Sequence, residues 1–173
     1  MDGHDTVDQL LDQWASGEYE LPLQALAVSK RVARIAQHLA RLDAAALAPL
    51  ELDPGEFDVL ATLLRSGPPY ELTPTALKQQ LMISSGGLTK RLTRLEQRGF
   101  VTRYLDPDDR RSLLVALSPT GRSLAESAVM AHSDTTADLV HRLAPEEQEQ
   151  LVALLRKLLI TIEQPAPTGA TQV

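Results

Sequence analysis

The sequence predicts a mainly helical (α+β) fold, a winged helix-turn-helix with N- and C-terminal dimerisation helices. Three observations lead to this prediction. Apolar residues recur at helical spacing through most of the chain, and capping residues followed by proline mark several helix starts. Two short helical patterns stand close together in the middle, and two strand-like runs follow them. Helical patterns on both flanks remain available for assembly with a second chain.

Length and composition exclude several classes of protein. The chain has 173 residues, which suits one domain with long helical additions. Its 43% apolar content, without any run of eighteen apolar residues, excludes a disordered chain and a membrane-spanning one. Aspartates rather than cations open the chain, which is wrong for a secretory signal peptide, so we expect a cytoplasmic protein. The absence of cysteine excludes disulfides, thiolate metal sites and thiol-based redox sensing.

The net charge of −6 is unevenly distributed. Residues 72–111 carry eight Lys or Arg against four Asp or Glu, a balance of +4. The remainder carries nine cations and nineteen anions, a balance of −10. Because a partner responds to the local field, one basic segment on an acidic body is compatible with a DNA-binding module.

Two helices are predicted before residue 51. A stripe of apolar residues from Val7 to Trp14 predicts a short amphipathic helix that ends near Gly17. Pro22 is a good first helical position, and apolar residues continue from it into the alanine-rich stretch before Leu47. The second helix is therefore long.

The middle of the chain opens with three successive helix starts. The stretch 53–56 has the composition of a capping box, and its helix stops before Gly67. Thr73, followed by proline, caps a short helix. Only a few residues later, Ser84 or Ser85 starts another. Two short helices in this order are typical of a helix-turn-helix.

The second short helix ends at Gly99 and is followed by a hairpin. Its apolar face consists of Leu88, Leu92 and Leu95. The runs 101–105 and 112–117 are rich in strand-forming residues, and the charged, turn-rich stretch 106–111 joins them. The order helix, turn, helix, hairpin predicts a wing.

The C-terminal region is predicted to hold two more helices, one to about residue 143 and one from Pro145 to about Ile162. Too much of the last helix is apolar for an exposed terminal helix, which favours a two-fold dimer. The domains expected are residues 1–50 as N-terminal helices, 51–118 as the DNA-binding domain, 119–163 as C-terminal dimerisation helices and 164–173 as a flexible tail.

The second short helix has the side chains that a recognition helix needs. With its leucines facing the core, its other faces present hydroxyl groups and cations suited to base edges and phosphates. At the hairpin tip, Arg110 could enter a minor groove, and Arg111 could meet backbone phosphate. The candidate DNA-binding residues are Thr75, Ser84, Ser85, Thr89, Lys90, Thr93, Arg94, Arg110 and Arg111.

These residues closely resemble the multiple-antibiotic-resistance regulator (MarR) family of bacterial transcription factors. The resemblance covers about residues 20–162, and its specific motifs are Leu72 to Leu77, Leu88 to Val101, Asp106 to Arg111 and Leu117 to Gly121. It implies a homodimer that binds pseudo-palindromic promoter DNA, usually as a repressor released by a small molecule. Half-sites should lie about one helical turn apart.

A narrower resemblance concerns the effector. The extra N-terminal helix with Trp14, together with Asp58, Arg91 and Arg103, is similar to the urate-responsive branch of that family. In that branch these residue types are implicated in binding urate and relaying its binding to the recognition helix. The same set occurs in relatives that respond to other anions, including tricarboxylates. The resemblance therefore implies a small anionic effector, with phenolic acids as further candidates.

Helical geometry gives this site some independent support. Arg91 lies about 60° from Leu88 around the helix, so it borders the buried face. Asp58 stands on a largely apolar helix and is expected to be partly desolvated, which favours an arginine partner. We hypothesise that an anionic ligand takes the arginine charge, repels Asp58 and shifts the helix of residues 85–98.

Simpler interpretations stay open at this point. Trp14 could anchor the first helix in the core, and Asp58 could form a purely structural ion pair. The run 106–111 could be an ordinary charged turn. A dimeric helical adaptor without DNA binding would use the same terminal helices.

Catalysis and cofactor binding find no support in the sequence. The stretch 84–87 is not a nucleophile elbow, and no phosphate-binding loop or dinucleotide fingerprint occurs. The four histidines lack zinc-site spacing. We expect neither an enzyme nor a metal protein, and no cofactor.

Overall fold

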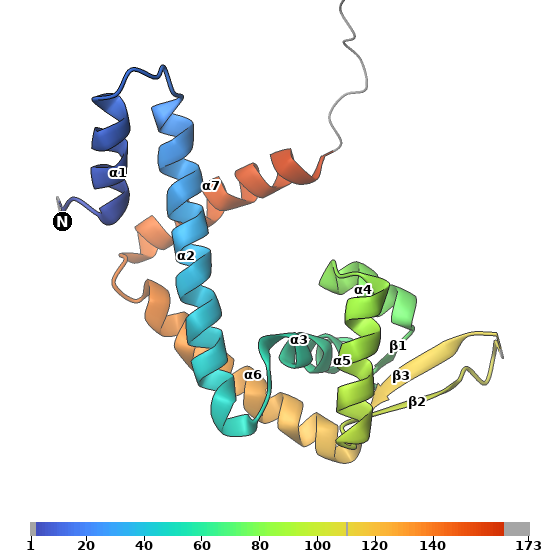
Figure 1. Cartoon of the computed structure of the whole chain (residues 1–173). Helices are drawn as coiled ribbons and strands as arrows, with labels where there is room; N and C mark the ends of the chain where they lie inside the picture. The colour runs from blue at the N-terminus through green and yellow to red at the C-terminus, as the bar shows by residue number, and fades with distance from the viewer. Residues whose placement is uncertain (1–2, 110, 165–173) are drawn as a thin grey trace, which may run out of the picture. The chain divides into compact units, whose positions relative to one another are not determined.

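The computed structural model describes residues 3–109 and 111–164 (Figure 1). Two compact units divide the chain, one ending at His132 and the other beginning at Ser133. The elements in chain order are α1 (Thr6–Ala15), α2 (Leu23–Leu47), the 3₁₀ turn η1 (Ala48–Leu50), α3 (Pro54–Arg65), β1 (Glu71–Leu72), α4 (Pro74–Leu81), α5 (Ser85–Gln97), β2 (Val101–Leu105), β3 (Leu113–Leu117), α6 (Pro119–Val140) and α7 (Pro145–Glu163). The predicted mainly helical winged helix-turn-helix is confirmed.

The helix starts of the middle region follow from their caps, as predicted. Asp53 accepts a hydrogen bond from the Glu56 N–H at 2.8 Å, and the Glu56 side chain returns to the Asp53 N–H, which completes a capping box for α3. Thr73 caps α4 and Ser84 caps α5 by accepting backbone N–H groups. α5 ends before Gly99, which has a left-handed φ of +73°.

The first helix is fastened to the second by an arginine. α1 and α2 lie side by side (Figure 1), with Val7 buried. Arg31 on α2 donates hydrogen bonds to the carboxylates of Asp5 and Asp8, the two residues that form the capping box of α1. These charged hydrogen bonds attach the extra N-terminal helix along α2.

A three-stranded antiparallel sheet forms the wing and its base. β2 and β3 pair from Val101↔Leu117 to Leu105↔Leu113, and this hairpin projects from α4 and α5 (Figure 1). β1, which was not predicted, pairs with the other side of β3 through Glu71↔Ala116. Two residues are too few for an alternating pattern to be recognised.

The core connects the helix-turn-helix to its supporting helices. Its fully or nearly fully buried side chains come from α2, α3, α4, α5, the sheet and α6, namely Leu47, Leu60, Leu63, Leu77, Leu88, Leu92, Leu95, Val101, Val115, Ala125 and Ala128. The predicted apolar face of α5 is confirmed as its buried face. α5 is thus held in place by its leucine face.

The last helix, α7, belongs to the second unit and has no buried residue in the described chain. Its large exposed apolar side chains are Leu151, Val152, Leu154, Leu155, Leu158, Leu159, Ile160 and Ile162. No helix in the described part of the chain is long and apolar enough to cross a membrane.

Candidate functional site

The outward face of α5 is polar and accessible. Lys90 and Thr89 are exposed, and Thr93 is half-buried. The Thr89 hydroxyl donates to the Ser85 carbonyl at 2.9 Å, which leaves its oxygen lone pairs as acceptors. Ser84 uses its hydroxyl oxygen to cap the helix, accepting the Gly87 N–H at 3.1 Å. Two more of the predicted DNA-binding residues, Ser85 and Thr75, are also exposed.

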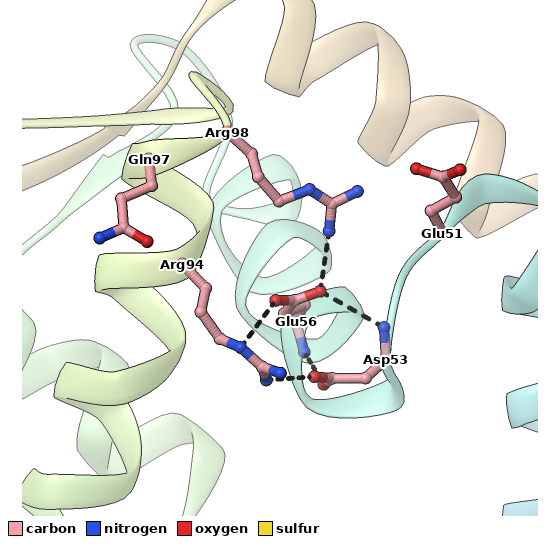
Figure 2. Close-up of a pocket in the computed structure, with 6 residues that line it drawn as sticks. All are labelled: Glu51, Asp53, Glu56, Arg94, Gln97 and Arg98. Atoms are coloured by element: carbon pink, nitrogen blue, oxygen red, sulfur yellow. Dashed lines mark hydrogen bonds and ion pairs between the residues drawn. The ribbon is translucent and has the colours of Figure 1, made fainter.

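Arg94 is engaged with α3. Its Nη1 atom lies 2.9 Å from Asp53 Oδ2, and its Nε lies 3.9 Å from Glu56 Oε1 (Figure 2). Arg98 Nη1 donates to Glu56 Oε2 at 3.1 Å. Glu56 is buried, with 4% of its surface exposed. The DNA role of Arg94 stays a prediction, and the structure adds an internal ion-pair cluster that the sequence analysis did not anticipate.

The wing tip is ordered by aspartates. Asp106 accepts the Asp108 N–H at 2.9 Å, and Asp109 accepts the Arg111 N–H at 3.1 Å and the Ser112 hydroxyl. The Arg111 side chain is almost fully exposed. Arg110 lies outside the described residues. The tip therefore offers Arg111 to solvent on a turn held by side-chain hydrogen bonds.

Asp58 and Arg91 are brought together. Arg91 Nη1 lies 3.9 Å from Asp58 Oδ2, and this Nη1 is buried without a hydrogen-bond acceptor among the described residues. The guanidinium lies against the backbone of α3 at Gly55, where an added Cβ would come within 2.5 Å of Arg91 Cζ. The Asp58 side chain is 53% exposed, but partial desolvation still raises the pKa of its carboxyl above the ordinary value, and the charge of Arg91 opposes this rise.

Further ionisable groups surround Asp58. His132 on α6 stacks on Phe57, with ring centroids 4.9 Å apart, and its Nε2 lies 3.2 Å from Asp43 Oδ1. The negative charge of Asp43 adds to the rise in the pKa of Asp58, and His132 opposes it. α2, α3, α5 and α6 thus all contribute charged or ionisable side chains near this carboxylate.

Arg103 is paired with a different carboxylate from Arg91. It hydrogen-bonds to Glu96 on α5, and this contact raises the pKa of the arginine. No hydrogen bond or ion pair joins Arg103 to Asp58 or Arg91 within residues 3–109 and 111–164. Arg103 instead lines a cavity of about 330 Å³ between α4, α5 and the hairpin, together with Thr75, Thr89 and Lys78.

Trp14 occupies a third position, on α1. Its ring makes an edge-to-face contact with Tyr19, with centroids 6.2 Å apart, and 43% of the residue is exposed. The four predicted ligand-binding residues are therefore distributed as one pair, Asp58 with Arg91, and two separate residues. The role of the set stays a prediction.

Sequence reasoning missed the partners of the α5 arginines. Arg91, Arg94 and Arg98 are spaced by three and four residues, a pattern that places them on one side of a helix. The capping box at Asp53 and Glu56 was predicted, but nothing in the sequence indicates which helix its carboxylates would face.

Comparison with known proteins adds independent findings. The sequence profile of the MarR family matches residues 50–112. The chain is 32% identical over 152 residues to the HTH-type transcriptional regulator PecS of Dickeya dadantii, covering 88% of this chain and 92% of PecS. Mutant MarR from Escherichia coli complexed with operator DNA superposes with a TM-score of 0.71 at 29% identity, covering 82% of this chain and 99% of that one. BpsR of Bordetella bronchiseptica, whose DNA binding is regulated by 6-hydroxynicotinic acid, gives a TM-score of 0.69 at 27% identity, with 82% and 97% covered.

Proposed function

We propose a function from the premise that the chain belongs to the MarR family of DNA-binding transcriptional regulators. In this proposal the protein is a homodimeric repressor, and a small anion releases it from pseudo-palindromic DNA. One observation carries this proposal furthest. The exposed polar face of α5 and the wing-tip arginine belong to one winged helix-turn-helix. The relative from Escherichia coli is described in complex with operator DNA, which supports the same use of this surface here.

The DNA-binding role predicts a steep dependence on salt. A preferred duplex is first selected from a random library with the wild-type protein, and its affinity is then measured by fluorescence anisotropy over a range of salt concentrations. Each phosphate neutralised contributes about 0.9 to the slope of log affinity against log salt. Lys90→Ala should weaken binding, and if Lys90 meets a phosphate the slope should fall by about one contact. Lys30→Ala, which removes an exposed cation from α2, is the matched control and should change neither quantity.

An adaptor without DNA binding gives the opposite result. Selection would then yield no preferred duplex, and association with any duplex would be weak and independent of Lys90. This outcome would overturn the proposed function.

The effector proposal centres on Arg91. The buried Nη1 of Arg91, which has no hydrogen-bond acceptor among the described residues, is suited to an anionic ligand, because a charged hydrogen bond there would satisfy this donor. The regulation of BpsR by 6-hydroxynicotinic acid supports an acidic effector for this chain as well. Urate is our preferred candidate. A tricarboxylate or a phenolic acid is the alternative, because a guanidinium donates hydrogen bonds to many anions.

The mechanism we propose uses the competition between Asp58 and the ligand. An anion that accepts the Arg91 hydrogen bond takes over the positive charge that now lies 3.9 Å from Asp58. Asp58 and the ligand then repel each other, and α5 shifts because Arg91 is part of it. DNA binding weakens because the spacing of the two recognition helices in the dimer no longer matches the half-sites.

Calorimetric titration of the purified protein with urate tests this effector. Saturable binding that Arg91→Ala weakens, that Asp58→Ala alters and that Lys30→Ala leaves unchanged would support the site. Trp14 is the only tryptophan, so quenching of its fluorescence reports whether α1 responds to the ligand. Absence of urate binding would leave DNA binding in place and direct the search to citrate, aconitate and phenolic acids. We also propose that the protein acts in the cytoplasm, where promoter DNA is available to it.

A further inference from the structure

We propose that the first turn of α3 positions the recognition helix on DNA, with the buried carboxylate of Glu56 as the central positioning residue. This inference rests on the proposed DNA-binding function. It assigns a role to a cluster of four charged side chains: Asp53, which caps α3, and Glu56 in its first turn, with Arg94 in the last turn of α5 and Arg98, which follows it (Figure 2). We call these four residues the α3–α5 clamp.

The clamp makes one side of α5 face α3. Arg94 and Arg98 are four residues apart, so their side chains leave the same side of the helix. Both converge on Glu56, and Arg94 also reaches Asp53 at 2.9 Å. One turn earlier, Arg91 lies against Gly55 of the same α3 turn. Three arginines, two within α5 and one just after it, are therefore directed to residues within 53–56, at the start of α3.

Glu56 is the residue of the clamp whose substitution should disturb both helices. It is buried, and its two oxygens serve both helices: Oε2 accepts from Arg98 at 3.1 Å and from the Asp53 N–H at 3.4 Å, while Oε1 faces Arg94 at 3.9 Å. A buried carboxylate is tolerated only with such partners. The same side chain thus closes the capping box of α3 and fixes the angle at which α5 lies against it.

This arrangement has a direct consequence for DNA. The leucine face holds α5 through apolar contacts, which permit small rotations of the helix about its own axis. Directional hydrogen bonds from the clamp restrict that rotation. Thr89, Lys90 and Thr93 are then presented to base edges at one fixed orientation, which is what specific binding requires and binding to phosphates alone does not.

Electrostatics alone predicts that loss of the Glu56 charge raises the affinity for DNA, whereas a positioning role predicts that the affinity for the preferred duplex falls. Removing a carboxylate near a DNA-binding helix lowers the repulsion of phosphates and should raise affinity for every duplex. Loss of positioning should instead lower the affinity for a preferred duplex while binding to unrelated DNA is kept. The ratio of the two affinities therefore separates a positioning role from a simple charge effect.

The experiment compares Glu56→Gln with Glu51→Gln. Glu51 lines the same cavity, of about 320 Å³, but it forms no ion pair within the described residues, so its variant makes the same charge change without touching the clamp. Each protein is titrated with the duplex that wild type selects from a random library and with a scrambled duplex of equal composition. Glu56→Gln should lower the ratio of affinities by about tenfold. Glu51→Gln should leave the ratio at its wild-type value.

A second variant tests whether a fall in the affinity ratio could result from misfolding instead of lost positioning. Asp53→Asn keeps an equally good helix cap but removes the charge that Arg94 meets, so α3 should fold normally. Circular dichroism and thermal melting check this, and the ratio should again fall, by less than for Glu56→Gln. An unchanged or higher ratio in a folded Asp53→Asn or Glu56→Gln protein would overturn the positioning role. Failure of wild type to select any duplex would instead overturn the proposed function, and this inference with it.

Discussion

Gly121 shows how closely a single residue can be constrained. It lies in the first turn of α6, where an added Cβ would stand 1.8 Å from the carbonyl oxygen of Phe100. Because that atom belongs to the backbone, it cannot move aside as a flexible side chain would. Gly121→Ala should lower the free energy of unfolding by about 2 to 3 kcal/mol, measured by urea denaturation.

A second glycine serves as the control. Gly86 lies within α5, and none of the described residues comes within 4 Å of an added Cβ. Gly86→Ala should leave stability unchanged or raise it by about 1 kcal/mol, because alanine favours helix. Equal losses in both variants would show that the contact with Phe100 is not the cause.

The Asp58 carboxyl gives a prediction on pH. Partial desolvation raises its pKa in the folded protein, so the folded state holds the proton more tightly than the unfolded chain does. Ionisation of Asp58 therefore costs stability as the pH rises from the ordinary aspartate pKa through the raised one. Asp58→Asn removes this cost, and the gain in unfolding free energy over wild type should be larger at neutral pH than at acidic pH.

Urea denaturation of both proteins at several pH values measures that difference. Asp43→Asn, which removes a neighbouring charge that also raises the pKa of Asp58, should shift the effect to lower pH. If Asp58→Asn instead lost stability towards neutral pH, the ion pair with Arg91 would outweigh the burial of Asp58.

At the scale of the element, α4 and α5 both end close to a residue in the left-handed conformation. Met82 closes α4 with a left-handed φ of 52° and is 80% exposed, whereas Gly99 follows α5 with a φ of +73°. Glycine adopts this conformation without the steric penalty that a side chain meets. Met82→Gly should therefore raise the free energy of unfolding by about 0.5 to 1 kcal/mol, measured by thermal and urea denaturation.

Gly99→Ala should move stability in the opposite direction by a similar amount. If both variants lowered the free energy of unfolding, contacts of the Met82 side chain would stabilise the end of α4 by more than its left-handed backbone costs.

The elements themselves were largely predictable because their signals are local. A cap such as Thr73 or Ser84 acts on the backbone three residues later, so the sequence states the helix start directly. β1 was missed because two residues acquire strand geometry only by pairing with β3, a partner over forty residues away. Local propensity carries no information on that pairing.

The candidate site was predictable to a smaller extent, for the same reason. The proximity of Asp58 and Arg91 follows from one helix packing on another through known apolar faces. The preference of Arg94 for Asp53 depends on how α3 and α5 are rotated against each other, which side-chain type does not reveal. Arg103 and Trp14 lie on other elements, whose distance from Asp58 is set by the tertiary fold.

At the scale of the whole molecule, the apolar surface of the long helices calls for a partner. α2 exposes Val28, Val32, Ile35 and Leu42, and eight large apolar residues of α7 are exposed in the single chain. Apolar side chains of this kind are rarely left in contact with water, and in the homodimer proposed above a second copy of the chain would cover them. The proposed repression at paired half-sites requires the same assembly.

A charge placed on α7 tests this dimer and its link to DNA binding. Leu158→Glu puts a carboxylate among the exposed apolar residues of α7, and burying it in an interface without a partner is costly. Sedimentation should show a shift from dimer to monomer, and affinity for the selected duplex should fall by about a hundredfold or more, because one recognition helix then binds alone. Gln150→Glu makes the same charge on a polar, exposed position of the helix and should change neither property. A monomeric Leu158→Glu protein that kept wild-type affinity would separate DNA binding from dimerisation, since each α5 would then suffice by itself.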